Sequence, residues 1–271
     1  RAITGGGESQ VDRALMAQLP SLEMVSIMGV GYDKVDVPAA LERRIPVTHT
    51  PDVLNDEVAD TAIGLMLSVA KKLPQADRYV REGRWEKEGA MPLARKMSGA
   101  RLGIVGLGRI GMAIARRAEA FGMSIAYTSR NRKDVKYLYH PSAVELATHV
   151  DFLVVITPGG AETRHMIDAR VLRALGTKGY LVNVARGTGG DEAALVEALR
   201  HGTIAGAALD VFENEPRVPQ ELREMDNVVL APHIGSATLQ TRHAMASLAF
   251  DNLAAHFAGR PLPTPVPECR A

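Results

Sequence analysis

Short apolar runs alternate with longer helical stretches through the second half of the chain. The runs consist largely of Val, Ile, Leu and Ala, and glycine or proline bounds many of them. Strands that are apolar on both faces are typical of a parallel sheet covered by helices on each side. The pattern predicts strands at residues 102–105, 124–127, 152–156, 180–184, 205–209 and 228–230, and helices at 111–121, 168–175 and 192–201.

A second set of elements lies before and after this regular region. Residues 24–28 and 47–50 are predicted strands, and residues 38–44 a short helix. A long, mostly apolar helix is predicted over 58–72, because Asn55, Asp56 and Glu57 suit a helix N-terminus. A last helix is predicted from about residue 240 to 258, where a proline-rich tail ends regular structure.

These elements predict an α/β protein with two doubly wound parallel-sheet domains. We expect residues 55–238 to form one continuous domain. Residues 1–54 and 239–271 are expected to form the other, which is therefore split in sequence.

Composition and charge exclude several classes of function. The 271 residues carry a net charge of about +1, which leaves no basic surplus for binding nucleic acid or an acidic membrane surface. No apolar run approaches membrane-spanning length, and the first residues do not form a signal peptide. The single cysteine, Cys269, rules out an internal disulfide and fits a reducing compartment, so a cytoplasmic location is expected.

A glycine pattern follows the predicted strand at 102–105. Gly106, Gly108 and Gly111 match G-x-G-x-x-G, which is a weak signal without its context. Here it joins a strand to a helix, so each glycine has a role in the turn, the approach of a pyrophosphate, or helix packing. The backbone amides of Arg109 and Ile110 are expected to face that pyrophosphate at the helix N-terminus.

The end of the next strand indicates which dinucleotide binds. An NAD site usually has Asp or Glu about 20 residues beyond the glycines, bonded to the ribose 2′-hydroxyl. This chain has Ser129, Arg130 and Arg132 there instead. Since arginine offers a bidentate partner for a 2′-phosphate, NADP is favoured over NAD. A solvated basic turn is the alternative, but it does not explain the missing acid.

Polar residues follow three further predicted strands. Arg186, Glu215 and His233 come after the strands at 180–184, 205–209 and 228–230. Ligands of an open parallel sheet bind beyond the carboxyl ends of its strands, so these side chains are expected to converge near the glycine loop. Reduction of a carbonyl needs a fixed cation and a proton donor beside the developing oxyanion. The remaining histidines show no spacing typical of a metal site, and no metal is expected.

Several separated motifs occur together in one order along the chain. They are Gly29-Val30-Gly31-Tyr32-Asp33, Thr50-Pro51-Asp52-Val53-Leu54, the glycine loop, and the segments that carry Arg186, Glu215 and His233. In this combination the sequence resembles the D-isomer-specific 2-hydroxyacid dehydrogenases, and within them the glyoxylate/hydroxypyruvate reductase group. The resemblance spans essentially all 271 residues.

The resemblance implies a Rossmann-type cofactor domain, a flavodoxin-like substrate domain, and NADPH-dependent reduction of a small 2-oxo acid to the D-2-hydroxy acid. It implies that His233 is the general acid, that Glu215 orients its imidazole, and that Arg186 binds the substrate's carboxylate and oxo group. It places the substrate carboxylate on the backbone amides of Val30 and Gly31, with Ser236 nearby. Further cofactor contacts implied by the resemblance are Thr157, Pro158, Thr163, Val184, Ala185, Asp210, His233 and Gly235.

The resemblance also implies a homodimer, formed through the helix after Asn55 and neighbouring segments. Trp85 is expected in a loop that reaches the partner's active site, although a plain surface loop is the alternative. Family members begin with a further strand–helix–strand portion, so we expect an N-terminal part of the substrate domain to be missing here. Thr188, Gly189 and Gly190 stand where the family has apolar residues, and a looser segment is expected there.

Other functions of this fold remain as alternatives. A dehydrogenase for a bulkier 2-oxo acid is one, and a dinucleotide-sensing corepressor of the same fold is another. A formate dehydrogenase would want an amide in place of Glu215, and phosphoglycerate dehydrogenases often carry an acid that selects NAD. Ser129 and Arg130 disfavour the sensor, since such proteins prefer NAD.

Overall fold

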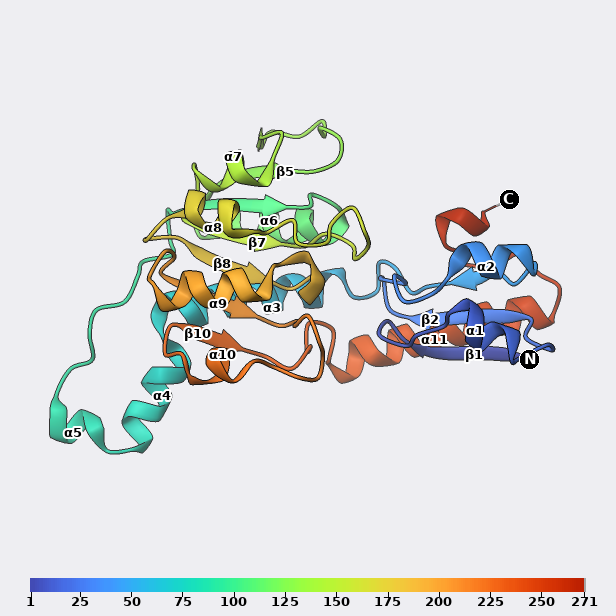
Figure 1. Ribbon diagram of the computed structural model, residues 1–271, viewed down its shortest axis with the longest axis horizontal. Helices are drawn as coiled ribbons and strands as arrows, with labels where there is room; N and C mark the ends of the chain where they lie inside the picture. Colours follow the sequence, from blue (N-terminus) through green and yellow to red (C-terminus); the bar gives the residue numbers. More distant parts are fainter. Residues whose placement is uncertain (271) are drawn as a thin grey trace. The chain divides into compact units, whose positions relative to one another are not determined.

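The computed structural model describes residues 1–270, which separate into two compact units (Figure 1). Unit 1 contains residues 1–55 and 236–270, and unit 2 contains residues 56–235. Within the described residues the strands form two sheets, one in each unit, and every pair of neighbouring strands is parallel. The predicted α/β class with two parallel sheets is confirmed.

Unit 2 is built on a seven-stranded sheet with the order β10-β9-β8-β7-β4-β5-β6. Its strands are β4 (Arg101–Val105), β5 (Ser124–Thr128), β6 (Leu138–Tyr139), β7 (Phe152–Val155), β8 (Tyr180–Asn183), β9 (Gly206–Leu209) and β10 (Val228–Leu230). β7 and β9 are buried along their whole length because helices cover both faces of the sheet, which explains their unbroken apolar sequence. After β4, strands β5 and β6 are added on one side of it, and β7 to β10 are added on the other side. The strand order therefore reverses between β4 and β7, and ligands of doubly wound sheets bind at such a point.

The helices of unit 2 follow these strands. They are α3 (Asn55–Lys71, which begins in unit 1), α4 (Leu73–Arg81), α5 (Arg84–Glu88), α6 (Arg109–Ala120), α7 (Ala143–Ala147), α8 (Ala169–Leu175), α9 (Glu192–Arg200) and α10 (Gln220–Glu224), with a 3₁₀ turn at Gly187–Gly189. Side chains of Ser142, Asp168 and Asp191 cap the N-termini of α7, α8 and α9 by accepting backbone N–H groups.

The sheet of unit 1 has the order β1-β2-β3 among the described residues. Its elements are β1 (Ala2–Gly6), α1 (Arg13–Ala17), β2 (Met24–Met28), α2 (Val37–Glu42), β3 (Val47–Thr48), α11 (Leu239–Phe257) and a 3₁₀ turn at Pro267–Cys269. Val25 and Ile27 of β2 point into a core shared with α1 and α2. The intervening Ser26 points to the opposite face, where its hydroxyl donates to the carbonyl oxygen of Ala249 in α11 at 3.4 Å.

A buried asparagine ties the C-terminal segment to α11. The side chain of Asn252 is fully buried and donates to Leu248 O at 2.8 Å and to Thr264 Oγ1 at 2.7 Å. Its own oxygen accepts the backbone N–H of Thr264 at 3.0 Å. The segment after α11 is therefore part of the same unit as β2 and β3, as the split domain of the sequence analysis requires.

Candidate active site

The glycine loop lies between β4 and α6, and its three glycines have different surroundings. A Cβ on Gly106 would lie 2.7 Å from Ile156 O, and one on Gly111 would lie 2.3 Å from Gly106 O. Gly106 also has a φ of +104°, which L side chains rarely adopt. A Cβ on Gly108 would meet nothing within 4 Å, so the middle glycine leaves open space in front of the first turn of α6. The loop therefore fits an anionic group at a helix N-terminus.

α6 begins at Arg109, two residues before the predicted start. The backbone amides of Arg109 and Ile110 thus belong to the first turn, where N–H groups have no partner within the helix. This earlier start places both amides where the sequence analysis expected a pyrophosphate to bind.

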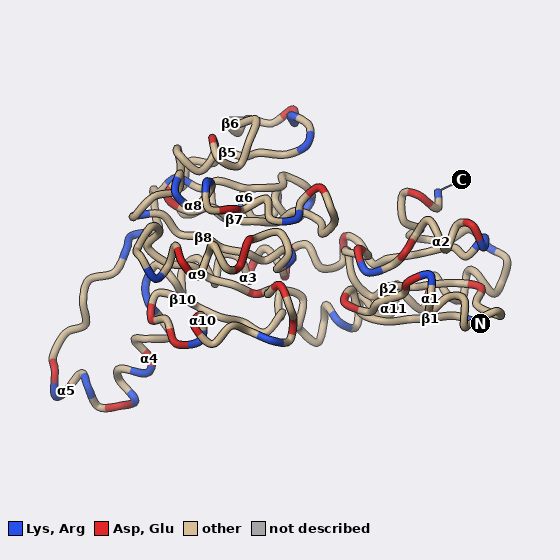
Figure 2. The backbone as a smooth tube through the Cα atoms, in the orientation of Figure 1, with Lys and Arg blue, Asp and Glu red and all other residues tan. Residues whose placement is uncertain are grey.

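The turn after β5 carries a cluster of cations, seen in Figure 2 between β5 and β6. Arg130 contacts Glu162 through an ion pair of 2.8 Å, and both side chains are 78% exposed. Ser129 closes the turn by donating from its hydroxyl to Asn131 O at 2.6 Å. Arg132 is exposed.

Glu162, the ion-pair partner of Arg130, lies in the loop after β7. Thr163 donates from its hydroxyl to Pro158 O at 2.8 Å, which closes the loop that begins at Thr157 and Pro158. The structure thus connects two of the segments assigned to the cofactor, the turn after β5 and the loop after β7.

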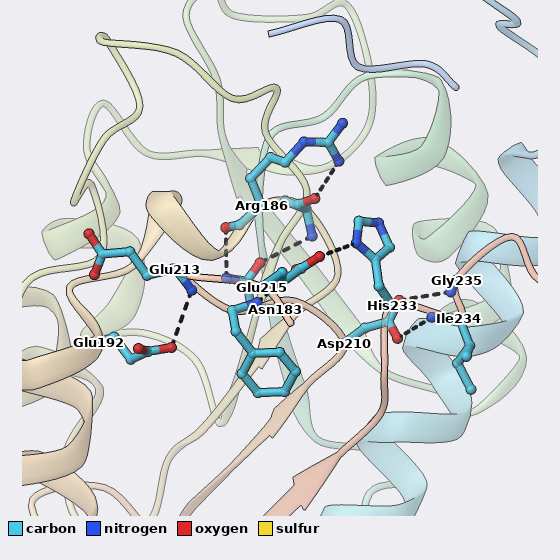
Figure 3. Close-up of polar contacts among 11 residues, drawn as sticks. Asn183, Arg186, Glu192, Asp210, Glu213, Glu215, His233, Ile234 and Gly235 are labelled. Atoms are coloured by element: carbon cyan, nitrogen blue, oxygen red, sulfur yellow. Dashed lines mark hydrogen bonds and ion pairs between the residues drawn. The ribbon is translucent and has the colours of Figure 1, made fainter. Parts of the chain in front are cut away.

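The backbone around Arg186 is held by a buried asparagine at the end of β8 (Figure 3). Asn183, only 5% exposed, accepts the N–H of Ala185 at 3.1 Å and donates to Arg186 O at 3.0 Å. The guanidinium of Arg186 donates to Ala185 O at 3.0 Å. Its positive charge lies close enough to contribute to the lowered pKa of Glu215 and to oppose, as a smaller effect, the raised pKa of His233.

Glu215 and His233 form a direct side-chain link in the candidate site. His233 Nδ1 lies 2.7 Å from Glu215 Oε2, and Glu215 Oε1 accepts the backbone N–H of Phe212 at 2.9 Å. The hydrogen bond to Glu215 raises the pKa of His233 above its ordinary value, against an opposing effect of burial. Burial acts to raise the pKa of Glu215, but the bonds from His233 and Phe212 outweigh it and the pKa lies below the usual range.

These opposite shifts define the pH window in which the ion pair exists. The Glu215 carboxylate is ionised above its lowered pKa, and the His233 imidazole is protonated below its raised pKa. Stability from the raised His233 pKa is complete below the ordinary histidine value and is lost as pH rises through the raised one. The ion pair therefore exists between these two pKa values, and within that window an imidazolium is available as a proton donor.

Asp210 fixes the backbone that carries His233. Its side chain is 1% exposed, and its two oxygens accept the N–H groups of Ile234 at 2.7 Å and Gly235 at 2.8 Å. His233 itself has a φ of +53°, in the left-handed region that non-glycine residues rarely adopt. The carboxylate stabilises this turn, and each oxygen has a further lone pair for a carboxamide.

The segment after Arg186 is a defined turn, so the expectation of a looser segment is wrong. The N–H of Gly189 donates to Arg186 O at 3.1 Å, and that of Gly190 to Gly187 O at 3.0 Å. His165 N donates to Thr188 O at 2.9 Å, and Gly190 pairs with Ile167 in a β-bridge.

Three of the residues assigned to the substrate lie in unit 1. Val30 and Gly31 follow β2, and Ser236 precedes α11. The carbonyl oxygen of Val30 accepts a hydrogen bond from Nδ1 of the buried His49 at 2.9 Å, and the ring of Tyr32 meets the His49 ring edge-on at 5.4 Å. His49 thus fixes the loop whose amides are the expected carboxylate site.

Some residues that hold the backbone or the side chains of the candidate site were not predicted from the sequence. Asn183, Glu162 and Glu192 all contact a segment assigned to the site, yet none stands in a recognisable motif. Asn183 could have been found as an amide at a strand end, three residues before the arginine. Nothing local marks Glu162 or Glu192, because their partners lie far away in sequence.

Known proteins resemble this chain over nearly its whole length. The sequence model of the family described as D-isomer specific 2-hydroxyacid dehydrogenase, NAD binding domain, matches residues 63–235. This chain belongs to the D-isomer specific 2-hydroxyacid dehydrogenase family. The family assignment confirms the resemblance inferred from the separated motifs.

Relatives of this dehydrogenase include enzymes from plants and bacteria. It is 52% identical over 267 residues to glyoxylate/hydroxypyruvate reductase A of Arabidopsis thaliana, covering 98% of this chain and 85% of the relative. It is 45% identical over 267 residues to 2-ketogluconate reductase of Gluconobacter oxydans, covering 98% and 86%. Among solved structures, the NADPH-dependent glyoxylate/hydroxypyruvate reductase of Sinorhizobium meliloti in complex with NADP and malonate is 53% identical. It superposes with a TM-score of 0.95 and covers 100% of this chain and 86% of that one.

No helix within residues 1–270 of the dehydrogenase has both the length and the apolar character needed to cross a membrane.

Replacing Glu215 by Gln should lower the pKa of His233, because the amide removes the charge and the strongest acceptor of Nδ1. NMR titration of the imidazole signals measures this shift directly. Glu145→Gln serves as the control, since Glu145 contacts His140 Nδ1 at 3.3 Å in another His–Glu pair. An unchanged His233 pKa in Glu215→Gln would contradict the proposed coupling.

Proposed function

We propose that this protein catalyses NADPH-dependent reduction of a small 2-oxo acid, such as glyoxylate or hydroxypyruvate, to the D-2-hydroxy acid. The observation that carries the proposal is the 2.7 Å contact between His233 Nδ1 and Glu215, with the Arg186 charge close by. Relatives named glyoxylate/hydroxypyruvate reductase and a structural neighbour described as NADPH-dependent support the substrate class and the cofactor.

The dinucleotide would be held by the glycine loop, the turn at Ser129–Arg132 and the loop after β7. Gly108 leaves the space that a side chain would fill in front of α6, so the loop fits a pyrophosphate. Arg130 would leave its solvent-exposed ion pair with Glu162 and bind the 2′-phosphate of the cofactor instead. When bound, NADPH supplies the hydride for the reaction.

The protein's own residues would orient the substrate and move one proton. Arg186 binds the carboxylate and polarises the oxo group. With Nδ1 of His233 bonded to Glu215, the proton to be transferred lies on Nε2. That proton goes to the substrate oxygen as negative charge develops on it, which leaves a neutral imidazole. The charge of Glu215 stabilises the imidazolium before transfer and fixes the orientation of the ring.

The alternative of a dinucleotide-sensing corepressor is not favoured. The relatives in which the chain covers most of both sequences are reductases, including 2-ketogluconate reductase and hydroxyphenylpyruvate reductase. Those two names identify larger substrates than glyoxylate, so a substrate panel should extend to bulkier 2-oxo acids.

The test is the oxidation of NADPH, followed by absorbance, with glyoxylate, hydroxypyruvate and larger 2-oxo acids. We expect turnover with NADPH that is lost by about 10²–10⁴-fold in His233→Ala, because the proton donor is gone. The rate of reduction should fall as pH rises through the raised pKa of His233. No oxidation across the panel by the wild-type protein would refute the reductase proposal.

Replacing Arg130 by Ala should weaken NADPH binding selectively. Loss of a charged hydrogen bond of about 1.5–3 kcal/mol corresponds to roughly a ten- to hundredfold higher Kd. Quenching of protein or cofactor fluorescence measures Kd for NADPH and NADH, and the value for NADH should change little. Lys136→Ala is the matched control, because this exposed cation of the same turn contacts Glu119 instead. Equal weakening of both cofactors would count against a 2′-phosphate site at Arg130.

We also propose that the protein is a homodimer. The long helix α3 buries most of its apolar side chains, whereas several large apolar side chains of α4, α5 and the following segment are exposed, among them Leu73, Val80, Trp85 and Leu93. Trp85 is 64% exposed and Leu93 98% exposed. In Figure 1 the segment that contains α4 and α5 extends away from the sheet of unit 2. An exposed apolar segment of this kind is typical of a subunit contact.

Substituting Trp85 and Leu93 together by Asp should shift the protein from dimer to monomer, because charged side chains would be buried in the contact. Sedimentation velocity gives the mass of each species. Phe250→Asp is the control, since Phe250 is 67% exposed on α11, outside this segment. A wild-type protein that sediments as a monomer at every concentration would exclude the proposed contact.

A further inference from the structure

Glu192 is a half-buried carboxylate at the start of α9 that the proposed reaction does not use. Acidic residues in a first helical turn are commonly solvated and interact with the helix dipole. The Glu192 side chain instead points toward the loop after β9, where Oε2 accepts the backbone N–H of Glu213 at 3.2 Å (Figure 3). Burial, with the nearby charge of Glu213, raises the pKa of Glu192 even though that N–H bond favours its ionised form.

The peptide that Glu192 holds is the junction between two parts of the active site. On one side, a Cβ on Gly187 would lie 1.8 Å from the carbonyl carbon of Phe212, so the backbone after Arg186 packs directly against this peptide. On the other side, the N–H of Phe212 donates to Glu215 Oε1 at 2.9 Å. A shift of the 212–213 peptide would therefore move both Arg186 and the carboxylate that orients His233.

The surroundings of Glu192 are mainly aliphatic. Its carboxylate lines a cavity of about 20 Å³, which is large enough for a single water molecule. Asn183, Gly187 and Asp191 form part of the wall, and most of the remainder is aliphatic. Removal of the carboxylate would leave the Glu213 N–H beside an enlarged, mainly apolar cavity, and the loop would move to satisfy it.

We propose that Glu192 is a positioning residue, which sets the geometry of Arg186 and of the Glu215–His233 pair by fixing the Phe212–Glu213 peptide. Its role for catalysis rests on the proposed reductase function. Glu192 contacts none of the reacting atoms, and no bond to it forms or breaks. The Glu213 N–H requires a hydrogen-bond acceptor on a side chain as long as that of glutamate. The amide oxygen of a glutamine should therefore serve nearly as well as the carboxylate.

Glu192→Ala should lower kcat on the order of ten- to a hundredfold, because small displacements of positioned groups have effects of this size. It should also lower the pKa of His233, measured by NMR titration, since Glu215 is no longer held in place. The Kd for NADPH should stay within about twofold of wild type, and Glu192→Gln should retain most of the activity and the wild-type His233 pKa. Glu197→Ala is the matched control, because Glu197 is exposed on the same helix and contacts Arg200 and His201.

Two outcomes would overturn the proposal. One is a Glu192→Ala protein with wild-type kcat and His233 pKa and only a lower Tm, which would make the contact purely structural. The other is equal impairment of Glu192→Ala and Glu192→Gln, which would show that an acceptor is not what the site needs. If Glu192→Ala does not fold, Glu192→Asp, which withdraws the carboxylate by one methylene, is judged by the same criteria. The NMR titration needs no turnover, so an inactive wild-type protein would refute the reductase function while this test still decides the role of Glu192.

Discussion

Asp210 carries a carboxylate that is almost completely removed from solvent at the end of β9, and both of its oxygens accept backbone N–H groups from the turn after His233. A buried carboxylate is costly unless it is well hydrogen-bonded, and burial raises the pKa of Asp210 despite these two bonds. The two bonds stabilise a turn in which His233 has a left-handed conformation, which costs about 1–2 kcal/mol for a non-glycine residue. The direction in which the imidazole points therefore depends on a residue that need not touch the substrate.

The parallel topology explains why residues so distant in sequence meet. Asn183, Asp210 and the segment of His233 each come at or just after the carboxyl end of neighbouring strands β8, β9 and β10. The ends of β8 and β9 each contribute a buried polar side chain that binds backbone, Asn183 and Asp210. The loops after β8, β9 and β10 carry Arg186, Glu215 and His233. Arg186 and His233 lie on different loops, and Glu215 joins the two parts through Phe212 and the imidazole.

Much of the fold could be predicted because its signals are local. The strands of unit 2 are unbroken apolar runs, and the glycine loop is recognisable between a strand and a helix. β6, with only two residues, was not predicted, because so short a strand has no periodicity of its own. The apolar character of α3 is typical of a buried helix, but nothing in its sequence distinguishes packing within a unit from packing against a second subunit.

The candidate site was predictable only for residues in motifs. Arg186, Glu215 and His233 follow strands in a fixed order, whereas Glu162 and Glu192 depend on contacts across loops. A charged residue on a loop or in a first helical turn looks the same in sequence whether it faces water or a buried amide. The distinction depends on tertiary packing, which no local pattern encodes.

The close approach at Gly187 has a consequence for how the active site can diverge. Because any side chain there would occupy the position of the Phe212 carbonyl group, the arginine and the glycine after it form a single inseparable unit. A gene duplicate that loses this glycine would lose the spacing between its guanidinium and imidazole even with all three polar residues intact. In a collection of such sequences, the glycine is thus a second marker of a surviving active site, beside the arginine it follows.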